Sequence, residues 1–172
     1  MNDTFLPGNG FDTYEEQDRV LMGLSGSVRS GVAVRILQQQ GFAVAAAVVR
    51  LADTPEEHAA ADAAKALAKK LDVECLALNA EALAGQDVDA ARFAALLTAA
   101  DKLGIQYVAS GHYARMETDT QGVSHLFPPE SGAPDESDRL AALSPEVLAR
   151  LILPLGDFAP EDVEDMAKDF KL

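Results

Sequence analysis

The sequence lacks the features that would place the chain outside the cytosol. It contains one cysteine, Cys75, so no disulfide can form within the chain. No apolar run reaches the roughly 18 residues that mark a membrane-spanning helix. Residues 1–18 are polar and acidic, without the basic and apolar regions of a secretory signal. We therefore expect a cytoplasmic protein, with Cys75 as a buried core thiol within its apolar run.

Basic residues are also scarce, with 14 Lys and Arg against 28 Asp and Glu and a net charge of −14. Autonomous RNA binding is not expected, because nucleic-acid binding normally needs a basic patch and no basic run is present. Eleven acidic and four basic residues between Glu130 and Leu172 account for half of the excess. Such concentrated charge favours association with a basic protein partner.

Apolar runs alternate with segments of helical periodicity through the first two thirds of the chain. This alternation predicts an α/β fold with a parallel sheet of five or a similar number of strands, covered by helices on both faces. Four strands are expected at residues 19–24, 42–51, 73–78 and 105–109, and helices at 28–41, at 56–71 and around Phe93 to Leu103.

The pattern changes after Ser110. Residues 112–116 and 123–127 are expected to pair as an antiparallel hairpin. Ser144 and Pro145 begin a helix whose apolar face includes Leu151 and Ile152, and a last helix follows Pro160. We thus expect a flexible leader at 1–17, a nucleotide-binding domain at 18–127, and a loop and helical extension at 128–172 packed on the same domain.

The segment from Gly23 to Ser30 joins the first strand to a helix. Small residues let a ligand approach the backbone, and the helix N-terminus favours an anion. In open α/β sheets, nucleotides bind at such loops beyond the carboxyl ends of the strands. A plain tight turn without a ligand has the same sequence pattern, so both interpretations remain open.

The segment GLSGSVRS at 23–30 resembles the SGGxDS pyrophosphate loop of PP-loop ATPases, most closely the GLSGGVDSS form of the tRNA 2-thiouridylases. ASGHYAR at 109–115 and LSPEVLARLILPLGD at 143–157 are similar to further segments of that family, in the same order. The resemblance implies a Rossmann-like fold of the adenine nucleotide alpha-hydrolase type, which binds ATP and adenylates a tRNA uridine. By the same resemblance, contacts with ATP or AMP fall on Gly23, Leu24, Ser25, Gly26, Ser27, Val28, Arg29, Ser30, Val49 and Gly111. His112 either contacts the nucleotide or has a structural hydrogen-bonding role.

The chain departs from the family pattern within the loop. Ser27 replaces the second glycine and Arg29 replaces the aspartate that helps to manage Mg²⁺. Arg29 either holds an anion directly and so replaces the metal, or points away and leaves the site inactive. A role for Mg²⁺ is therefore doubtful.

The resemblance also implies two cysteines, and neither is present. Asp87 stands where the first is expected, and the second family position lies beyond Leu172, so the chain resembles a truncated and degenerate member. Because a carboxylate cannot accept sulfur as a thiolate does, thiolation by this chain alone is not expected, and no catalytic residue is assigned. Neither the histidines nor Cys75 have metal-ligand spacing. Three hypotheses remain: a nucleotide-binding protein without thiolation, an acidic scaffold of a tRNA-modification or sulfur-transfer system, and an adenylating enzyme whose partner supplies the missing cysteines.

Overall fold

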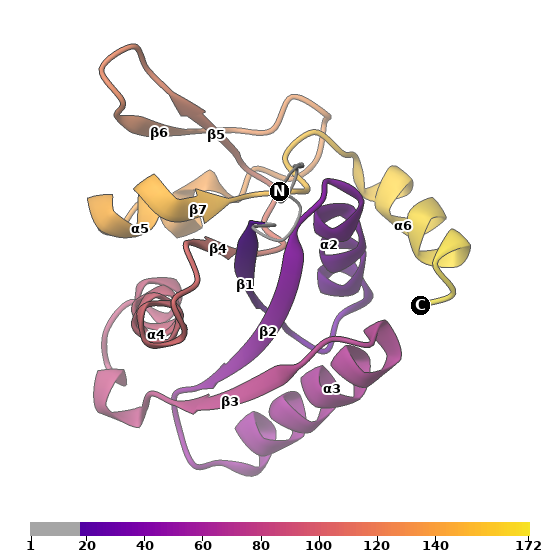
Figure 1. Ribbon diagram of the computed structural model, residues 1–172, viewed down its shortest axis with the longest axis vertical. Helices are drawn as coiled ribbons and strands as arrows, with labels where there is room; N and C mark the ends of the chain where they lie inside the picture. Colours follow the sequence, from indigo (N-terminus) through magenta and orange to yellow (C-terminus); the bar gives the residue numbers. More distant parts are fainter. Residues whose placement is uncertain (1–17) are drawn as a thin grey trace, which may run out of the picture.

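The computed structural model describes residues 18–172, so the expected leader at 1–17 lies outside the described residues. Five parallel strands form one sheet, which confirms the α/β prediction (Figure 1). In spatial order they are β3 (Cys75–Asn79), β2 (Ala43–Arg50), β1 (Arg19–Gly23), β4 (Tyr107–Ala109) and β7 (Leu151–Ile152). The central strand β1 places Leu21 between Ala45 of β2 and Val108 of β4.

Helices cover both faces of the sheet, as the sequence predicts (Figure 1). The first face carries α2 (Val28–Gln39), α3 (Pro55–Leu71) and α6 (Pro160–Asp169), and the second carries α4 (Val88–Leu103) and α5 (Pro145–Arg150). Two short 3₁₀ helices, η2 (Glu81–Leu83) and η3 (Ser137–Leu140), lie in connections. Because successive strand side chains point to opposite faces, Val20 and Met22 of β1 belong to one core and Leu21 to the other.

The helix ends follow from local sequence signals. The side chains of Ser27, Thr54, Asp87 and Ser144 each accept a backbone N–H at the start of a helix. At the other end of α4, Gly104 adopts a left-handed conformation that favours glycine.

The predicted hairpin is present but begins later than expected. Its strands are β5 (Arg115–Thr118) and β6 (Ser124–Phe127), which pair antiparallel with Arg115 opposite Phe127. The expectation that the first strand starts at His112 is wrong. His112 instead bonds to Ser110, and Tyr113 is buried with its backbone N–H donated to Glu136.

The assignment of Leu151 and Ile152 to a helix is also wrong. The helix α5 ends at Arg150, and these two residues form the edge strand β7, with Leu151 opposite Val108. Arg150 fixes this ending because its guanidinium donates to the carbonyls of Gln106 at 2.8 Å and Ile105 at 2.9 Å. A short apolar run does not by itself distinguish a buried strand from a helix.

The topology leaves a crevice beyond the carboxyl ends of β1 and β4. From β1 the sheet continues through β2 and β3 on one side, and through β4 and β7 on the other. The helix that follows β1 and the helix that precedes β4 lie on opposite faces. Ligands of open α/β sheets bind at such a switch point. Among residues 18–172, no helix is long and apolar enough to cross a membrane.

Candidate nucleotide site

A cavity of about 250 Å³ lies at this switch point. Its walls come from the carboxyl ends of β1, β2 and β4, the first turns of α2, α3 and α4, and η3. The lining residues are Gly23, Leu24, Ser25, Ser27, Arg29, Ser30, Ala47, Val48, Val49, Glu57, Ala60, Asp89, Arg92, Phe93, Leu96, Ser110, Gly111, His112 and Arg139.

The loop between β1 and α2 is organised by its own serines. The Ser27 hydroxyl accepts the backbone N–H of Ser30 at 3.3 Å and so caps α2. The Ser30 hydroxyl donates to the carbonyls of Ser25 and Ser27 at 2.9 and 2.8 Å. These bonds hold the helix N-terminus at the cavity wall, where its partial positive charge favours an anion.

Arg29 lines the cavity but is held by an internal partner. Its guanidinium lies 3.4 Å from the Glu136 carboxylate and 4.6 Å from the ring centroid of Tyr113. Glu136 is only 15% exposed and also accepts the Tyr113 backbone N–H at 2.8 Å. Arg29 therefore neither points away from the site nor stands unpaired in it.

His112 is fixed by neighbours on two sides. Its Nδ1 lies 2.7 Å from the Ser110 hydroxyl, and its Nε2 lies 3.5 Å from Asp89. The Phe93 ring packs against the imidazole at a centroid distance of 6.1 Å. Burial lowers the pKa of His112 below its ordinary value, and this effect exceeds the opposing attraction of Asp89. Burial in the cavity wall thus favours the neutral form of the imidazole.

The remaining cations of the cavity are Arg92 and Arg139. Arg139 pairs with Asp89 at 3.2 Å and with Glu136 at 3.5 Å, so it bridges two carboxylates. Arg92 has a looser pairing, with 3.7 Å separating its guanidinium from Glu57. Its Nε is buried and has no hydrogen-bond partner among the described residues.

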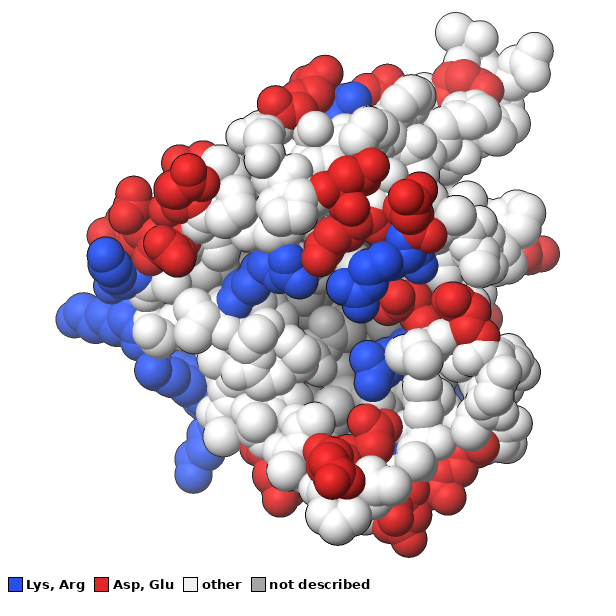
Figure 2. All heavy atoms as spheres, turned by 180° about the vertical axis from the view of Figure 1, so that it is seen from behind, with Lys and Arg blue, Asp and Glu red and all other residues white. Residues whose placement is uncertain are grey.

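The site is therefore close to self-neutralised. Three guanidinium groups, those of Arg29, Arg92 and Arg139, face the carboxylates of Glu57, Asp89 and Glu136. Figure 2 shows a hollowed face with basic side chains at its rim and acidic side chains beside them. The local charge thus differs from that of the chain as a whole, which is strongly acidic.

The structure brings together most of the residues that the resemblance implied. Gly26 and Val28 are the exceptions, because neither lines the cavity. A side chain at Gly26 would lie 2.6 Å from the Cβ of Ala63, so this glycine allows close packing of the loop on α3. Val28 is largely exposed.

Several cavity residues were not identified from the sequence, chiefly Glu57, Asp89, Arg92, Ser110 and Arg139. The charged ones lie on the first turns of α3 and α4 and on η3, far from the loop in sequence. These residues could have been identified by their positions, because segments just after the carboxyl ends of strands and at the starts of helices meet at one edge of a parallel sheet.

No thiol lies at the cavity. Cys75 begins the edge strand β3 and is partly buried against the first core, so the expectation of a buried core thiol is confirmed only in part. Burial nevertheless raises the pKa of its thiol. Asp87 has a structural role, because its carboxylate caps α4 by accepting the Ala90 N–H at 3.0 Å. Within residues 18–172, no group of three or more His, Cys, Asp or Glu side chains could hold a metal ion.

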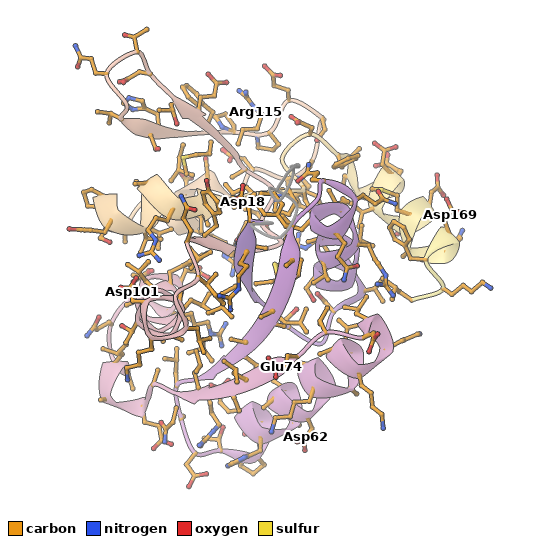
Figure 3. The ribbon with its side chains drawn as sticks, in the orientation of Figure 1. Asp18, Asp62, Glu74, Asp101, Arg115 and Asp169 are labelled. Atoms are coloured by element: carbon orange, nitrogen blue, oxygen red, sulfur yellow. The ribbon has the colours of Figure 1, made fainter. Side chains whose placement is uncertain are left out.

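The acidic charge is spread over the outside of the molecule. Figure 3 labels Asp62 on α3, Asp101 on α4 and Asp169 on α6, three separate helices. All three side chains are exposed. The helix α6 adds further exposed carboxylates at Glu161, Asp162, Glu164 and Asp165.

Comparison with protein families gives a match over residues 86–172 to the model described as tRNA methyl transferase HUP domain. Among curated proteins, the chain is 32% identical to the tRNA-specific 2-thiouridylase MnmA of Yersinia pestis (strain Pestoides F), over 91% of this chain and 49% of that protein. It is 28% identical to the enzyme of the same name from Lactococcus lactis, over 88% of this chain and 48% of the relative. The chain thus spans about half the length of the curated relatives it matches.

Among solved structures, the fold is similar to the U34-tRNA thiolase NcsA from Methanococcus maripaludis, which was determined with its 4Fe–4S cluster. The TM-score is 0.60 at 17% identity, over 91% of this chain and 58% of that one. A predicted subunit of tRNA methyltransferase from Methanocaldococcus jannaschii gives a TM-score of 0.52 at 14% identity, over 88% of this chain and 76% of that one. At these identities the likeness establishes the fold alone.

Proposed function

The chain belongs to the tRNA methyl transferase HUP domain family, and from this membership we propose that its cavity binds an adenine nucleotide or another phosphate ligand without thiolating tRNA by itself. By its similarity to the curated relatives, it is a 2-thiouridylase-like protein. The single observation that carries the proposal is the placement of the cavity at the switch point, against the serine-rich loop and the N-terminus of α2.

The cavity offers a nucleotide both an apolar surface for the base and polar positions for the phosphate. Gly23, Val49 and Leu96 give an apolar surface on which a base can pack, while Ser25, Ser27 and Gly111 present small polar or open backbone positions. Most binding sites for small molecules combine an apolar lining with a few placed polar groups. The α2 N-terminus then supplies the electrostatic preference for phosphate.

The absence of thiolation is proposed from the position of the one cysteine. Sulfur transfer through a persulfide needs a thiolate close to the substrate. Cys75 does not line the cavity, and burial raises its pKa and so lowers its thiolate fraction. At the position where the resemblance implies the nucleophile, Asp87 provides a helix cap instead.

Metal-independent binding is the second element of the proposal. The loop position expected to hold an aspartate holds Arg29, whose charge would oppose a cation, and Glu136 already neutralises it. The loop at 23–30 thus offers no carboxylate that could hold Mg²⁺ beside a phosphate. We therefore propose that ATP or AMP binds without a requirement for Mg²⁺.

A second candidate function, an acidic scaffold that binds a basic protein, is favoured by the exposed carboxylates of α6. These residues lie on the outer face of the helix, while Val163 and Ala167 are buried against the core. Such a surface accelerates association with a basic partner in a salt-dependent way. A partner that supplies a cysteine at the cavity would turn the same chain into part of an adenylating enzyme.

Isothermal titration of the purified chain with ATP and AMP, each with and without Mg²⁺, tests the main proposal. We expect saturable binding of at least one nucleotide, unchanged by the metal, and a rise in the melting temperature at saturation. Absence of binding at millimolar nucleotide would reject the nucleotide-binding proposal and favour the scaffold. Turnover of ATP to AMP and pyrophosphate by the chain with a cysteine-bearing partner would instead support the enzymatic alternative.

A further inference from the structure

We propose that the cavity selects a nucleoside monophosphate over a nucleoside triphosphate, with Arg92 as the residue that holds its single phosphate group. This inference rests on the proposed nucleotide binding and narrows it to one ligand class. Three features of the site carry it: the firm pairing of Arg29 and Arg139, the loose pairing of Arg92 and the absence of a carboxylate from the loop at 23–30.

The cations of the cavity differ in how firmly they are paired. Glu136 neutralises Arg29 at 3.4 Å, and Asp89 pairs with Arg139 at 3.2 Å. Both carboxylates are largely buried, at 15% and 14% exposure, so solvent screens these pairs less than surface pairs. Two of the three guanidiniums are thus committed to partners within the chain.

Arg92 is the exception. Its one ion pair within residues 18–172, with Glu57, spans 3.7 Å, and that carboxylate also accepts the backbone N–H of Leu51 at 2.8 Å. The Arg92 side chain is 42% exposed and lines the cavity, so its guanidinium can donate charge-assisted hydrogen bonds to a phosphate oxygen.

The carboxylates of the site also act against longer phosphate chains. Each additional phosphate adds negative charge, and Arg29 and Arg139 do not offset it because Glu136 and Asp89 already neutralise them. No aspartate in the loop recruits a cation to offset that charge, because Arg29 occupies the position. One phosphate is therefore the charge that the site can balance.

The test is a titration series with adenosine, AMP, ADP and ATP, with and without Mg²⁺, on the wild type and four variants. We expect AMP to bind most tightly and Arg92→Gln to weaken AMP at least tenfold while adenosine changes less than twofold. Lys102→Gln is the matched control, because Lys102 lies on the same helix, is exposed and lies outside the cavity. Its affinity for AMP should equal that of the wild type.

Glu136→Gln tests the role of the carboxylates, since the amide oxygen can still accept the Tyr113 N–H while Arg29 and Arg139 lose a charged partner. The ratio of ATP to AMP affinity should rise at least fivefold. Arg92→Lys, which keeps the charge, separates loss of the phosphate contact from misfolding, which circular dichroism checks for every variant. Tightest binding of Mg²⁺–ATP by the wild type, or AMP binding unaffected by Arg92→Gln, would overturn this inference and leave the proposed function intact. Failure of every nucleotide to bind would reject both.

Discussion

Arg29 and Glu136 are 107 positions apart in the sequence, yet their side chains meet at 3.4 Å beside the cavity. The pair joins the first turn of α2 to the segment just before η3. Because Glu136 also accepts the Tyr113 N–H, it links the loop after β4 to the same point. The charge of Arg29 at the cavity is therefore balanced by a residue that lies far from the loop in the sequence.

Replacement of Arg29 by alanine should lower the free energy of unfolding by about 1 kcal/mol. Solvent-exposed ion pairs contribute roughly 0.2–1 kcal/mol, this pair is partly buried, and the contact of Arg29 with the Tyr113 ring adds a similar small amount. Urea denaturation of Arg29→Ala, Glu136→Gln and the double variant measures the coupling. We expect about 0.5 kcal/mol, whereas additive effects would show that the two side chains do not interact in solution.

Gly26→Ala should destabilise the protein by about 1–3 kcal/mol, because the added methyl would lie 2.6 Å from the Cβ of Ala63 on α3. Ala63→Gly removes that clash at the cost of about 1 kcal/mol for glycine within a helix. The double variant should thus be more stable than Gly26→Ala alone. Gly111→Ala is the control, because its methyl would lie at an ordinary 3.6 Å from Ser30 Cα. Equal melting temperatures for Gly26→Ala and Gly111→Ala would contradict the proposed packing.

Asp87→Ala should cost about 1 kcal/mol, because the backbone N–H of Ala90 loses its capping acceptor. Asp87→Ser preserves a capping oxygen and should retain most of the stability. Chemical denaturation of the two variants decides the point. If serine were as destabilising as alanine, the role of Asp87 would lie in its charge at the helix N-terminus rather than in the hydrogen bond.

A thiol at position 87 should react faster than the natural one. In a Cys75→Ala background, Asp87→Cys places the sulfur at the exposed N-terminus of α4, where the helix dipole lowers a thiol pKa. Burial raises the pKa of Cys75 in the wild type. Alkylation by iodoacetamide at pH 7 should therefore be several-fold faster in the variant. Equal rates would indicate that the environment of residue 87 does not activate a thiol.

Acidification should destabilise the protein through His112. Burial holds the pKa of His112 in the folded state below the value of about 6.5 expected when unfolded. Between these two values the unfolded state binds more protons, so stability falls as the pH drops below about 6.5 and is fully present above it. Denaturation of the wild type and of His112→Gln from pH 7.5 to 5 should show a weaker pH dependence in the variant. Parallel curves would assign the dependence to other groups.

Local signals predicted most of the elements that position the site. The serine cap at Ser144, the apolar run of β2 and the helical periodicity of α3 each act through neighbours in sequence, so their effects can be recognised there. The same holds for the loop residues of the cavity, whose position after a buried strand indicated a ligand site. Leu151 and Ile152 were misassigned because only pairing with β4 makes them a strand.

The sequence by itself therefore determined the α/β class, the order of elements and the loop that borders the cavity, because periodicity and capping are local properties. It also determined that one thiol is present and that Arg29 occupies the loop. Only the tertiary structure decided what Arg29 and Arg92 do, since their partners Glu136 and Glu57 come from other elements. Ion pairing and burial depend on distance in space, and the fold sets that distance by bringing the carboxyl ends of β1, β2 and β4 to one edge of the sheet.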